Sequence, residues 1–173
     1  KMKGKGFTCV PCAEGPPLLC EGQQCWWSSC SGVVETEPDS AEYLLVTRHL
    51  ADSLGRKPEI GSLNRVQNAA AFSSFRWQDK LTIMFHGCTS QANEDSIMQH
   101  GFDVSHCKSG GARYGTWFAY KSSYSDSKFA FLDAADWKHL FVCLVSNHDV
   151  KKDDGEVMRV VGKGGAYPQW MVV

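Results

Sequence analysis

The sequence predicts one α+β domain, and three observations support that fold class. The chain has 173 residues, of which 43% are hydrophobic and 12% aromatic, enough to fill a single core. Helical and strand patterns both occur, and both are short. The strand patterns gather late in the chain instead of alternating with helices, as they would in a doubly wound sheet.

The first 38 residues predict irregular structure, because glycine and proline are frequent there and no hydrophobic period persists. This stretch holds five of the eight cysteines, namely Cys9, Cys12, Cys20, Cys25 and Cys30. We therefore expect a cysteine-rich segment at 1–38 and a domain at 39–173.

Three roles for these cysteines stay open. Cys9 and Cys12 form a C-x-x-C pair, a common way to present two thiolates to zinc, with further ligands from Cys20, Cys25 or Cys30. Disulfides of a secreted protein, or thiols without a role, are the alternatives. Zinc would indicate a reducing compartment, and an intracellular location, cytoplasm or nucleus, is the one we expect.

Three helices are expected in the first part of the domain. Ser40 offers an N-cap and Gly55 a stop for the first helix. Its buried face would hold Tyr43, Val46, Leu50 and Leu54. A second helix is expected from 62 to about 72. Ser90 caps a third helix, which Gly101 ends in a left-handed C-cap.

Strand patterns dominate the rest of the domain. The expected strands are Leu81–Phe85, Trp117–Ala119, His139–Val145, Glu156–Val161 and Gln169–Val173. The charged stretch Asn147–Gly155 predicts a turn between two of them.

Charge and hydropathy bear on two classes of partner. The formal net charge is −1, which gives no reason to expect a nucleic-acid partner, since such a partner usually needs a basic surface. The longest apolar runs, such as Phe141–Val145, are too short to cross a bilayer, so no membrane partner is expected. The sequence carries no prediction of oligomeric state.

A candidate ligand site begins where the strand at 81–85 ends. His86 and Gly87 follow at once, and histidine can bond a sugar hydroxyl while glycine lets a ligand approach the backbone. The stretch 117–129 then combines aromatic rings with serine hydroxyls, which together can hold a planar heterocycle. A turn histidine and ordinary helix packing are the structural alternatives.

Six blocks of sequence together resemble poly(ADP-ribose) polymerase-like transferases. In chain order the blocks are LNRVQN, MFHGCTS, SIMQHGFD, RYGTWFAYKSSYS, KHLFVCLV and GAYPQWMVV. The resemblance covers about residues 60–173 and is nearest to the branch that transfers single ADP-ribose units. It implies two packed, mostly antiparallel sheets with peripheral helices. It also implies an enzyme that takes NAD as substrate, releases nicotinamide and modifies a protein or nucleic-acid acceptor.

The resemblance also implies roles for individual residues. His86 matches the residue that bonds a ribose hydroxyl of NAD, and Gly87 the glycine whose backbone pairs with the nicotinamide amide. Ser125 matches the serine that bonds the same amide, and Phe129 the ring that stacks on nicotinamide. The remaining pocket residues implied are Cys88, near the adenosine ribose, and Trp117 with its neighbour Phe118.

Two departures from the family pattern bear on catalysis. Trp117 stands where the family has tyrosine, so the site gains bulk and loses a hydroxyl. The signature glutamate is matched by Glu156 if the glycine-rich turn after it carries one extra residue, and by Val157 without that insertion. We expect Glu156 to be catalytic with His86 and Trp117. The alternative is a degenerate transferase fold that binds NAD, ADP-ribose or a protein without catalysis.

Overall fold

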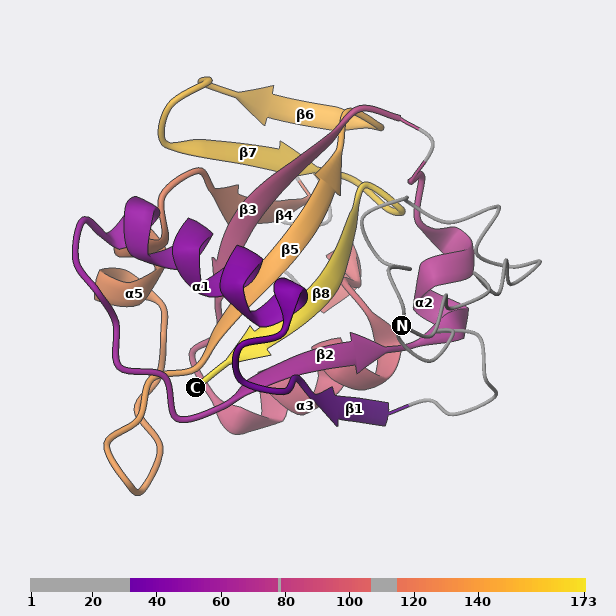
Figure 1. Cartoon of the computed structure of the whole chain (residues 1–173). Helices are drawn as coiled ribbons and strands as arrows, with labels where there is room; N and C mark the ends of the chain where they lie inside the picture. Colours follow the sequence, from indigo (N-terminus) through magenta and orange to yellow (C-terminus); the bar gives the residue numbers. More distant parts are fainter. Residues whose placement is uncertain (1–31, 78, 107–114) are drawn as a thin grey trace, which may run out of the picture.

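The computed structural model describes residues 32–77, 79–106 and 115–173 (Figure 1). In this part of the chain, eight antiparallel strands form one sheet in the order β1-β2-β8-β5-β3-β4-β7-β6. The strands are β1 Gly32–Glu35, β2 Leu63–Gln67, β3 Leu81–Gly87, β4 Thr116–Ala119, β5 Leu140–Ser146, β6 Val150–Asp153, β7 Met158–Val161 and β8 Ala166–Val172. The helices are α1 Ala41–Leu54, α2 Ala69–Ser74, α3 Gln91–His100, the 3₁₀ turn η3 Val104–His106 and α5 Ser122–Lys128. The predicted α+β class is confirmed.

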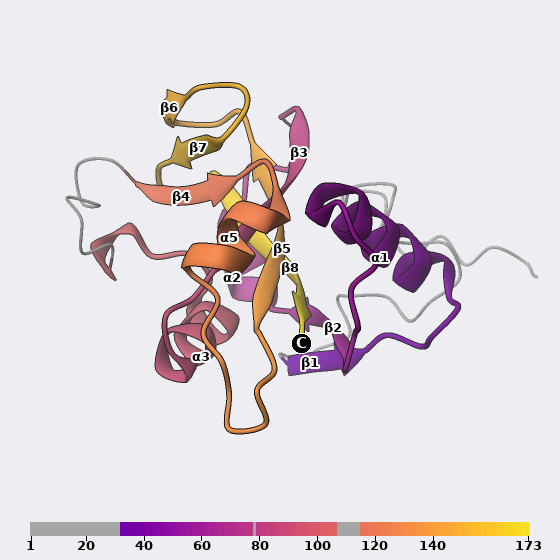
Figure 2. The ribbon, with the colours of Figure 1, turned by 90° about the vertical axis from the view of Figure 1, so that its left-hand side faces the viewer.

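The sheet consists of two halves that meet between β3 and β4. β3 pairs with β5 along its whole length, from Leu81 opposite Ser146 to Gly87 opposite Leu140. It pairs with β4 through Phe85 and Ala119. Beyond this junction β4, β7 and β6 run across the direction of β3, β5 and β8 (Figures 1 and 2). The two predicted sheets are therefore continuous through one residue pair.

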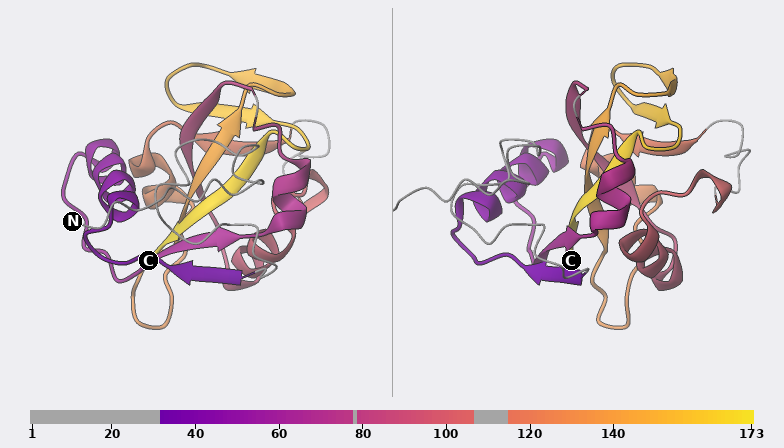
Figure 3. Two further views of the ribbon diagram at one scale, coloured as in Figure 1. Left: turned by 45° about the vertical axis from the view of Figure 1, so that its right-hand side comes forward. Right: turned by 90° about the vertical axis from the view of Figure 1, so that its right-hand side faces the viewer.

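Helices α1 and α3 lie on opposite sides of the sheet (Figures 2 and 3). On the α1 side, Val46 and Leu50 pack with Val142 and Leu144 of β5. On the other side, a second cluster contains Phe141, Cys143 and Val145 of β5, with Ile97 and Met98 of α3 packed against it. β5 is thus buried on both faces, which explains its continuous apolar sequence.

Three of the four predicted helix caps have the predicted geometry, and the one at Gly101 differs. The Ser40 hydroxyl accepts a hydrogen bond from the Tyr43 N–H at 3.1 Å, and Gly55 ends α1 with φ 73°. The Ser90 hydroxyl caps α3 in the same way, 3.3 Å from the Asn93 N–H. Gly101 ends α3 with φ 73°, although its ψ of −164° lies outside the left-handed helical region.

The prediction of a helix at 62–72 is wrong over its first half. Leu63–Gln67 is the strand β2, which pairs with β1 and β8, and only Ala69–Ser74 is helical. Pairing on both edges and the burial of Leu63 and Val66 outweigh the helical pattern of the local sequence.

Two further stretches expected to be irregular form edge strands. β1 lies within the segment 1–38, and β6 lies within the expected turn 147–155. Both are exposed along their whole length, so neither shows the alternation of polar and apolar residues that marks a half-buried strand. The boundary between a segment at 1–38 and a domain at 39–173 stays a prediction. In the described ranges, no helix combines the length and the apolar character needed to cross a bilayer.

Candidate active site

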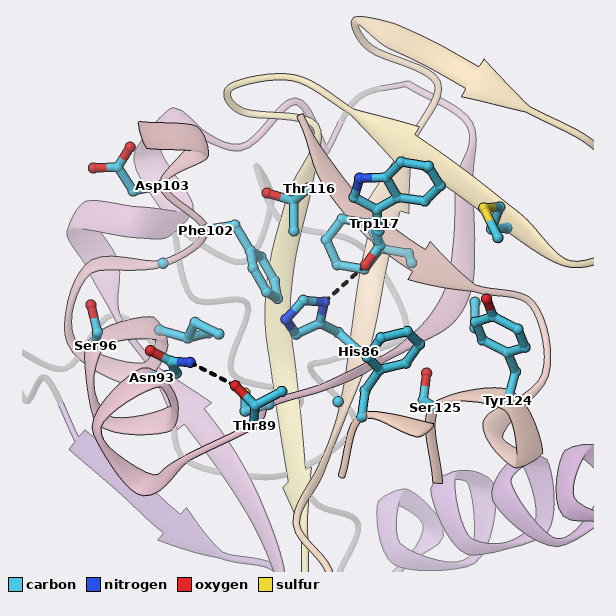
Figure 4. A pocket seen from close by; sticks show the side chains of 18 residues that line it. His86, Thr89, Asn93, Ser96, Phe102, Asp103, Thr116, Trp117, Tyr124 and Ser125 are labelled. Atoms are coloured by element: carbon cyan, nitrogen blue, oxygen red, sulfur yellow. Dashed lines mark hydrogen bonds between the residues drawn. The ribbon is translucent and has the colours of Figure 1, made fainter. Parts of the chain in front are cut away.

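A cavity of about 620 Å³ opens where β3 and β4 diverge (Figure 4). Its wall consists of the end of β3 and the residues after it, one face of α3 with the loop that follows, β4, α5 and the start of β7. The lining residues are His86, Gly87, Cys88, Thr89, Asn93, Ser96, Ile97, Gly101, Phe102, Asp103, Thr116, Trp117, Phe118, Ala119, Tyr124, Ser125, Phe129 and Met158. All seven residues predicted to bind NAD are among them.

His86 lies in the middle of this cavity, between α3 on one side and α5 on the other (Figure 4). Its Nδ1 is 2.8 Å from the backbone carbonyl oxygen of Trp117. Because a carbonyl only accepts hydrogen bonds, Nδ1 carries the proton and donates it. In the neutral ring, Nε2 is then an acceptor.

The surroundings of His86 favour that neutral ring. Burial lowers the pKa of His86 below its ordinary value of 6.5, against a smaller raising effect of the Trp117 carbonyl. Two rings fix its orientation, Phe102 at 5.1 Å and Phe118 at 5.5 Å between ring centroids. At neutral pH the site therefore presents an oriented hydrogen-bond acceptor to a ligand hydroxyl.

Gly87 leaves no room for a side chain. A Cβ at this position would lie 2.8 Å from both the carbonyl carbon and the Cβ of Phe129, and 2.9 Å from the Ala130 nitrogen. The strand end and the 129–130 backbone are thus in direct contact. Only glycine permits this approach, which brings Phe129 to the rim of the cavity.

The α5 end of the cavity holds one buried hydroxyl and several aromatic rings. The Ser125 hydroxyl is buried and donates a long hydrogen bond, 3.4 Å, to the Phe85 carbonyl. The rings of Tyr124 and Phe129 are 5.7 Å apart, and Phe129 is 41% exposed. An exposed ring beside a polar anchor can stack on a planar heterocycle.

Trp117 forms part of the wall and leaves the cavity open. Its side chain is 36% exposed, and the Lys152 ammonium lies 5.6 Å from the ring centroid. The neighbouring residues Phe118 and Cys88 are buried. Desolvation, with a smaller effect from Glu94, raises the pKa of Cys88 to about 12, so its thiol is a poor nucleophile.

The structure does not bring Glu156 to the cavity. Asp154 Oδ1 accepts hydrogen bonds from the backbone N–H groups of Glu156 at 3.1 Å, Val157 at 2.7 Å and Met158 at 2.9 Å. This tight turn leaves Glu156 exposed and Val157 42% exposed, and neither lines the wall. Met158, opposite Ala119 in the β4–β7 pairing, occupies that part of the wall instead.

A buried arginine holds β7 in this register. Arg159 donates from Nε to Asp153 Oδ2 at 2.8 Å and from one terminal nitrogen to the Tyr120 hydroxyl at 2.8 Å. The Tyr120 hydroxyl in turn donates to Asp153 Oδ1 at 2.8 Å. These bonds tie the β6–β7 hairpin to the end of β4, and with it Met158 to the cavity.

Sequence reasoning missed several lining residues. Asn93 and Ser96 project from α3, and Asp103 lies just beyond it. Polar side chains are common on and next to a surface helix, so the sequence did not mark these residues as part of a site. This face of α3 lines a cavity only because β3 and β4 diverge. Tyr124 belongs to the aromatic and hydroxyl-rich stretch that did signal a site.

The possible zinc ligands Cys9, Cys12, Cys20, Cys25 and Cys30 lie outside the described residues. In the part of the chain that the structure describes, no group of three or more His, Cys, Asp or Glu side chains could hold a metal ion. The described cysteines, Cys88 and Cys143, are buried free thiols.

Two comparisons with known proteins agree with this geometry. The family described as the poly(ADP-ribose) polymerase catalytic domain matches residues 40–169. A protein named a probable poly [ADP-ribose] polymerase, from Dictyostelium discoideum, is 22% identical over 175 residues, covering 81% of this chain and 51% of the relative. The chain thus spans about half the length of the curated relative it matches.

Proposed function

The chain belongs to the poly(ADP-ribose) polymerase catalytic-domain family, and from this premise we propose that it transfers single ADP-ribose units from NAD to a protein or nucleic-acid acceptor. Nicotinamide would be released. The observation that carries the proposal is the placement of His86: the Trp117 carbonyl holds its Nδ1, and its Nε2 is an acceptor inside the cavity.

NAD would lie along the cavity with its two ends in different surroundings. The nicotinamide end fits the α5 side, where Gly87 brings the backbone close and Ser125 offers a hydroxyl to the carboxamide. Trp117 and Phe129 would close over the pyridine ring. The adenosine end fits the side of Asn93, Ser96 and Asp103, whose polar groups suit a sugar and a purine. His86, between the two ends, would accept a ribose hydroxyl.

In the transition state of the proposed reaction, positive charge develops on the ribose, and the site must stabilise that charge. The bond between the ribose carbon and the nicotinamide nitrogen breaks, and nicotinamide leaves with the electron pair as a neutral molecule. The acceptor nucleophile forms the new bond and gives up its proton. Catalysis requires that the hydrogen bond from the ribose to His86 be stronger in this state than in bound NAD.

Transfer of one unit is favoured over chain growth by the residue at the start of β7. Extending a chain requires a base that activates a ribose hydroxyl of the previous unit. Met158 at this part of the wall has no group that accepts a proton, and Glu156 lies in the exposed turn. An acceptor that brings its own nucleophile, such as a carboxylate, avoids that requirement.

A binding module without catalysis is the second candidate. It is favoured by the indole at position 117 and by the absence of Glu156 and Val157 from the described cavity wall. Such a module would bind NAD or ADP-ribose with the same residues and release no nicotinamide.

The test is incubation with labelled NAD, following nicotinamide release and label on the protein. We expect turnover by the wild type and a loss of about 100-fold or more in His86→Ala, typical of removing a group that stabilises a transition state. His148→Ala, which changes a partly exposed histidine outside the cavity wall, is the matched control and should keep full activity. NAD binding without turnover would support the binding module, and neither binding nor turnover would refute both candidates.

A further inference from the structure

Three side chains behind the cavity wall form a bridge that the proposed reaction does not use. His139, 9% exposed, places Nδ1 2.8 Å from Glu94 Oε2 and Nε2 3.2 Å from Asp133 Oδ2. Glu94 is 2% exposed, and its second oxygen accepts a hydrogen bond from Gln91 Nε2 at 3.2 Å. A carboxylate this deeply buried requires such partners.

The protons of the bridge follow from its geometry. Both imidazole nitrogens face carboxyl oxygens, and an ionised carboxylate can only accept. The three groups therefore share two protons, either both on His139 or one on His139 and one on a carboxyl group. With both protons on His139, both hydrogen bonds are charge-assisted. With one proton on a carboxyl group, only the bond to the remaining carboxylate is charge-assisted and so stronger than a neutral one.

The two arms of the bridge belong to different walls of the cavity. Glu94 lies on α3, the helix that presents Asn93, Ser96 and Ile97 to the cavity. Asp133 lies in the segment 129–139, which starts at the rim residue Phe129.

The segment 129–139 also contacts the cavity wall directly. The Phe131 N–H donates to the Cys88 carbonyl at 3.0 Å, and the Phe131 ring lies 4.7 Å from the ring of His139. Displacing the segment would therefore move the backbone next to Gly87, where Phe129 and Ala130 are in direct contact with it.

We propose that His139 is a positioning residue for the NAD site: by bridging Glu94 and Asp133 it holds α3 and the segment 129–139 at the separation that NAD requires. The inference rests on the proposed function for the identity of the ligand. The bridge itself exists in the free protein, so its mechanical role can be tested separately.

The sharpest variants are at Asp133, which is the more exposed arm. Asp133 Oδ1 also accepts from the N–H groups of Ala135 at 2.8 Å and Trp137 at 2.9 Å, so Asp133→Ala would disturb the loop as well. Asp133→Ser keeps a hydroxyl for this turn but is too short to reach His139. Asp133→Asn keeps both the turn and a group that bonds His139 Nε2. Asp136→Asn, in the same loop, is a matched control for the loss of charge.

We expect Asp133→Ser to weaken NAD binding, measured by calorimetry on the whole chain, by about five-fold or more, because the hydrogen bond that joins position 133 to His139 is lost. Asp133→Asn should stay within about two-fold of the wild type, because its amide can still bond His139. Asp136→Asn should do the same, because Asp136 is not part of the bridge. Rescue by Asn at the same position separates positioning from a general loss of stability. Equal affinities for Ser and Asn at position 133 would overturn the proposal.

Hydrogen exchange of the free protein provides the second readout. Asp133→Ser should speed exchange of the Phe131 amide and of the α3 amides, and Asp133→Asn should not. If the wild type binds no NAD, the proposed function fails, and this measurement alone decides whether the bridge holds the two walls together. Unchanged exchange in Asp133→Ser would refute the bridge.

Discussion

At the scale of single residues, the Trp117 carbonyl determines which nitrogen of His86 carries the proton. A backbone acceptor at 2.8 Å leaves Nε2 without a proton in the neutral ring. The role of Trp117 in the site is therefore twofold, since its backbone orients His86 while its indole forms part of the wall. The first of these contributions comes from the backbone, so it does not depend on which side chain stands at position 117.

The side chain of Glu156 is expected to contribute little to catalysis. Because it lies in an exposed turn outside the cavity wall, we expect Glu156→Gln to change kcat for nicotinamide release by less than about two-fold. If the Glu156 carboxylate stabilised the transition state, the same substitution would lower kcat by about 100-fold or more. A loss of that size would restore the catalytic role expected for Glu156 from the sequence and show that the turn rearranges when NAD binds.

Sequence reasoning predicted residues of the cavity wall better around His86 than at the start of β7. His86 and Gly87 end β3, Ser125 lies in α5 and Phe129 follows it, and all four line the cavity. Between Glu156 and the next matching block lies a glycine-bearing turn at 162–165, where one inserted residue has little cost. The strand pairing of Met158 with Ala119 is a tertiary property that no local pattern revealed.

At the scale of helices and strands, the prediction was correct where neighbouring residues alone determine the structure. The caps of α1 and α3 satisfy orphan N–H groups with adjacent side chains, so the sequence alone located both helix starts. The strand β2 was not predicted, because its extended conformation depends on pairing with β1 and β8, which lie far from it in the sequence. The strand β6 was not predicted, because an exposed edge strand carries no burial pattern.

The junction of β3 and β4 is the element-scale feature that makes the site. β5 pairs with one edge of His86 and Gly87, and continued pairing of β3 with β4 beyond Phe85 and Ala119 would use the other edge as well. The divergence of β3 and β4 leaves that second edge facing a cavity, in which α3 and α5 supply the two ends. The same divergence turns α3 from a surface helix into a cavity wall, which is why its polar residues escaped prediction.

At the scale of the whole molecule, buried titratable groups predict a stability maximum between about pH 6.5 and pH 9. Burial lowers the pKa of both His49 and His86 from 6.5, so the unfolded chain binds more protons below that pH and stability falls on acidification. Burial raises the pKa of Cys88 and of Tyr167, each to about 12, and that of Cys143. The unfolded chain then loses protons first at high pH, so stability also falls there.

Urea unfolding of the whole chain checks this profile at about pH 5, 7.5 and 10. The free energy of unfolding should be largest at the middle value. A protein more stable at pH 5 than at pH 7.5 would show that the two histidines are not held neutral in the folded state.

The proposed function requires that the cavity hold the nicotinamide end of NAD between Gly87, Ser125 and the rings of Trp117 and Phe129. A crystal structure of the protein with nicotinamide bound would test this placement. We predict the carboxamide on the Gly87 backbone and the Ser125 hydroxyl, with the ring stacked on an aromatic side chain and His86 still bonded to the Trp117 carbonyl. Nicotinamide bound elsewhere, or the Trp117 indole occupying the space beside Gly87, would show that this cavity is not the nicotinamide site.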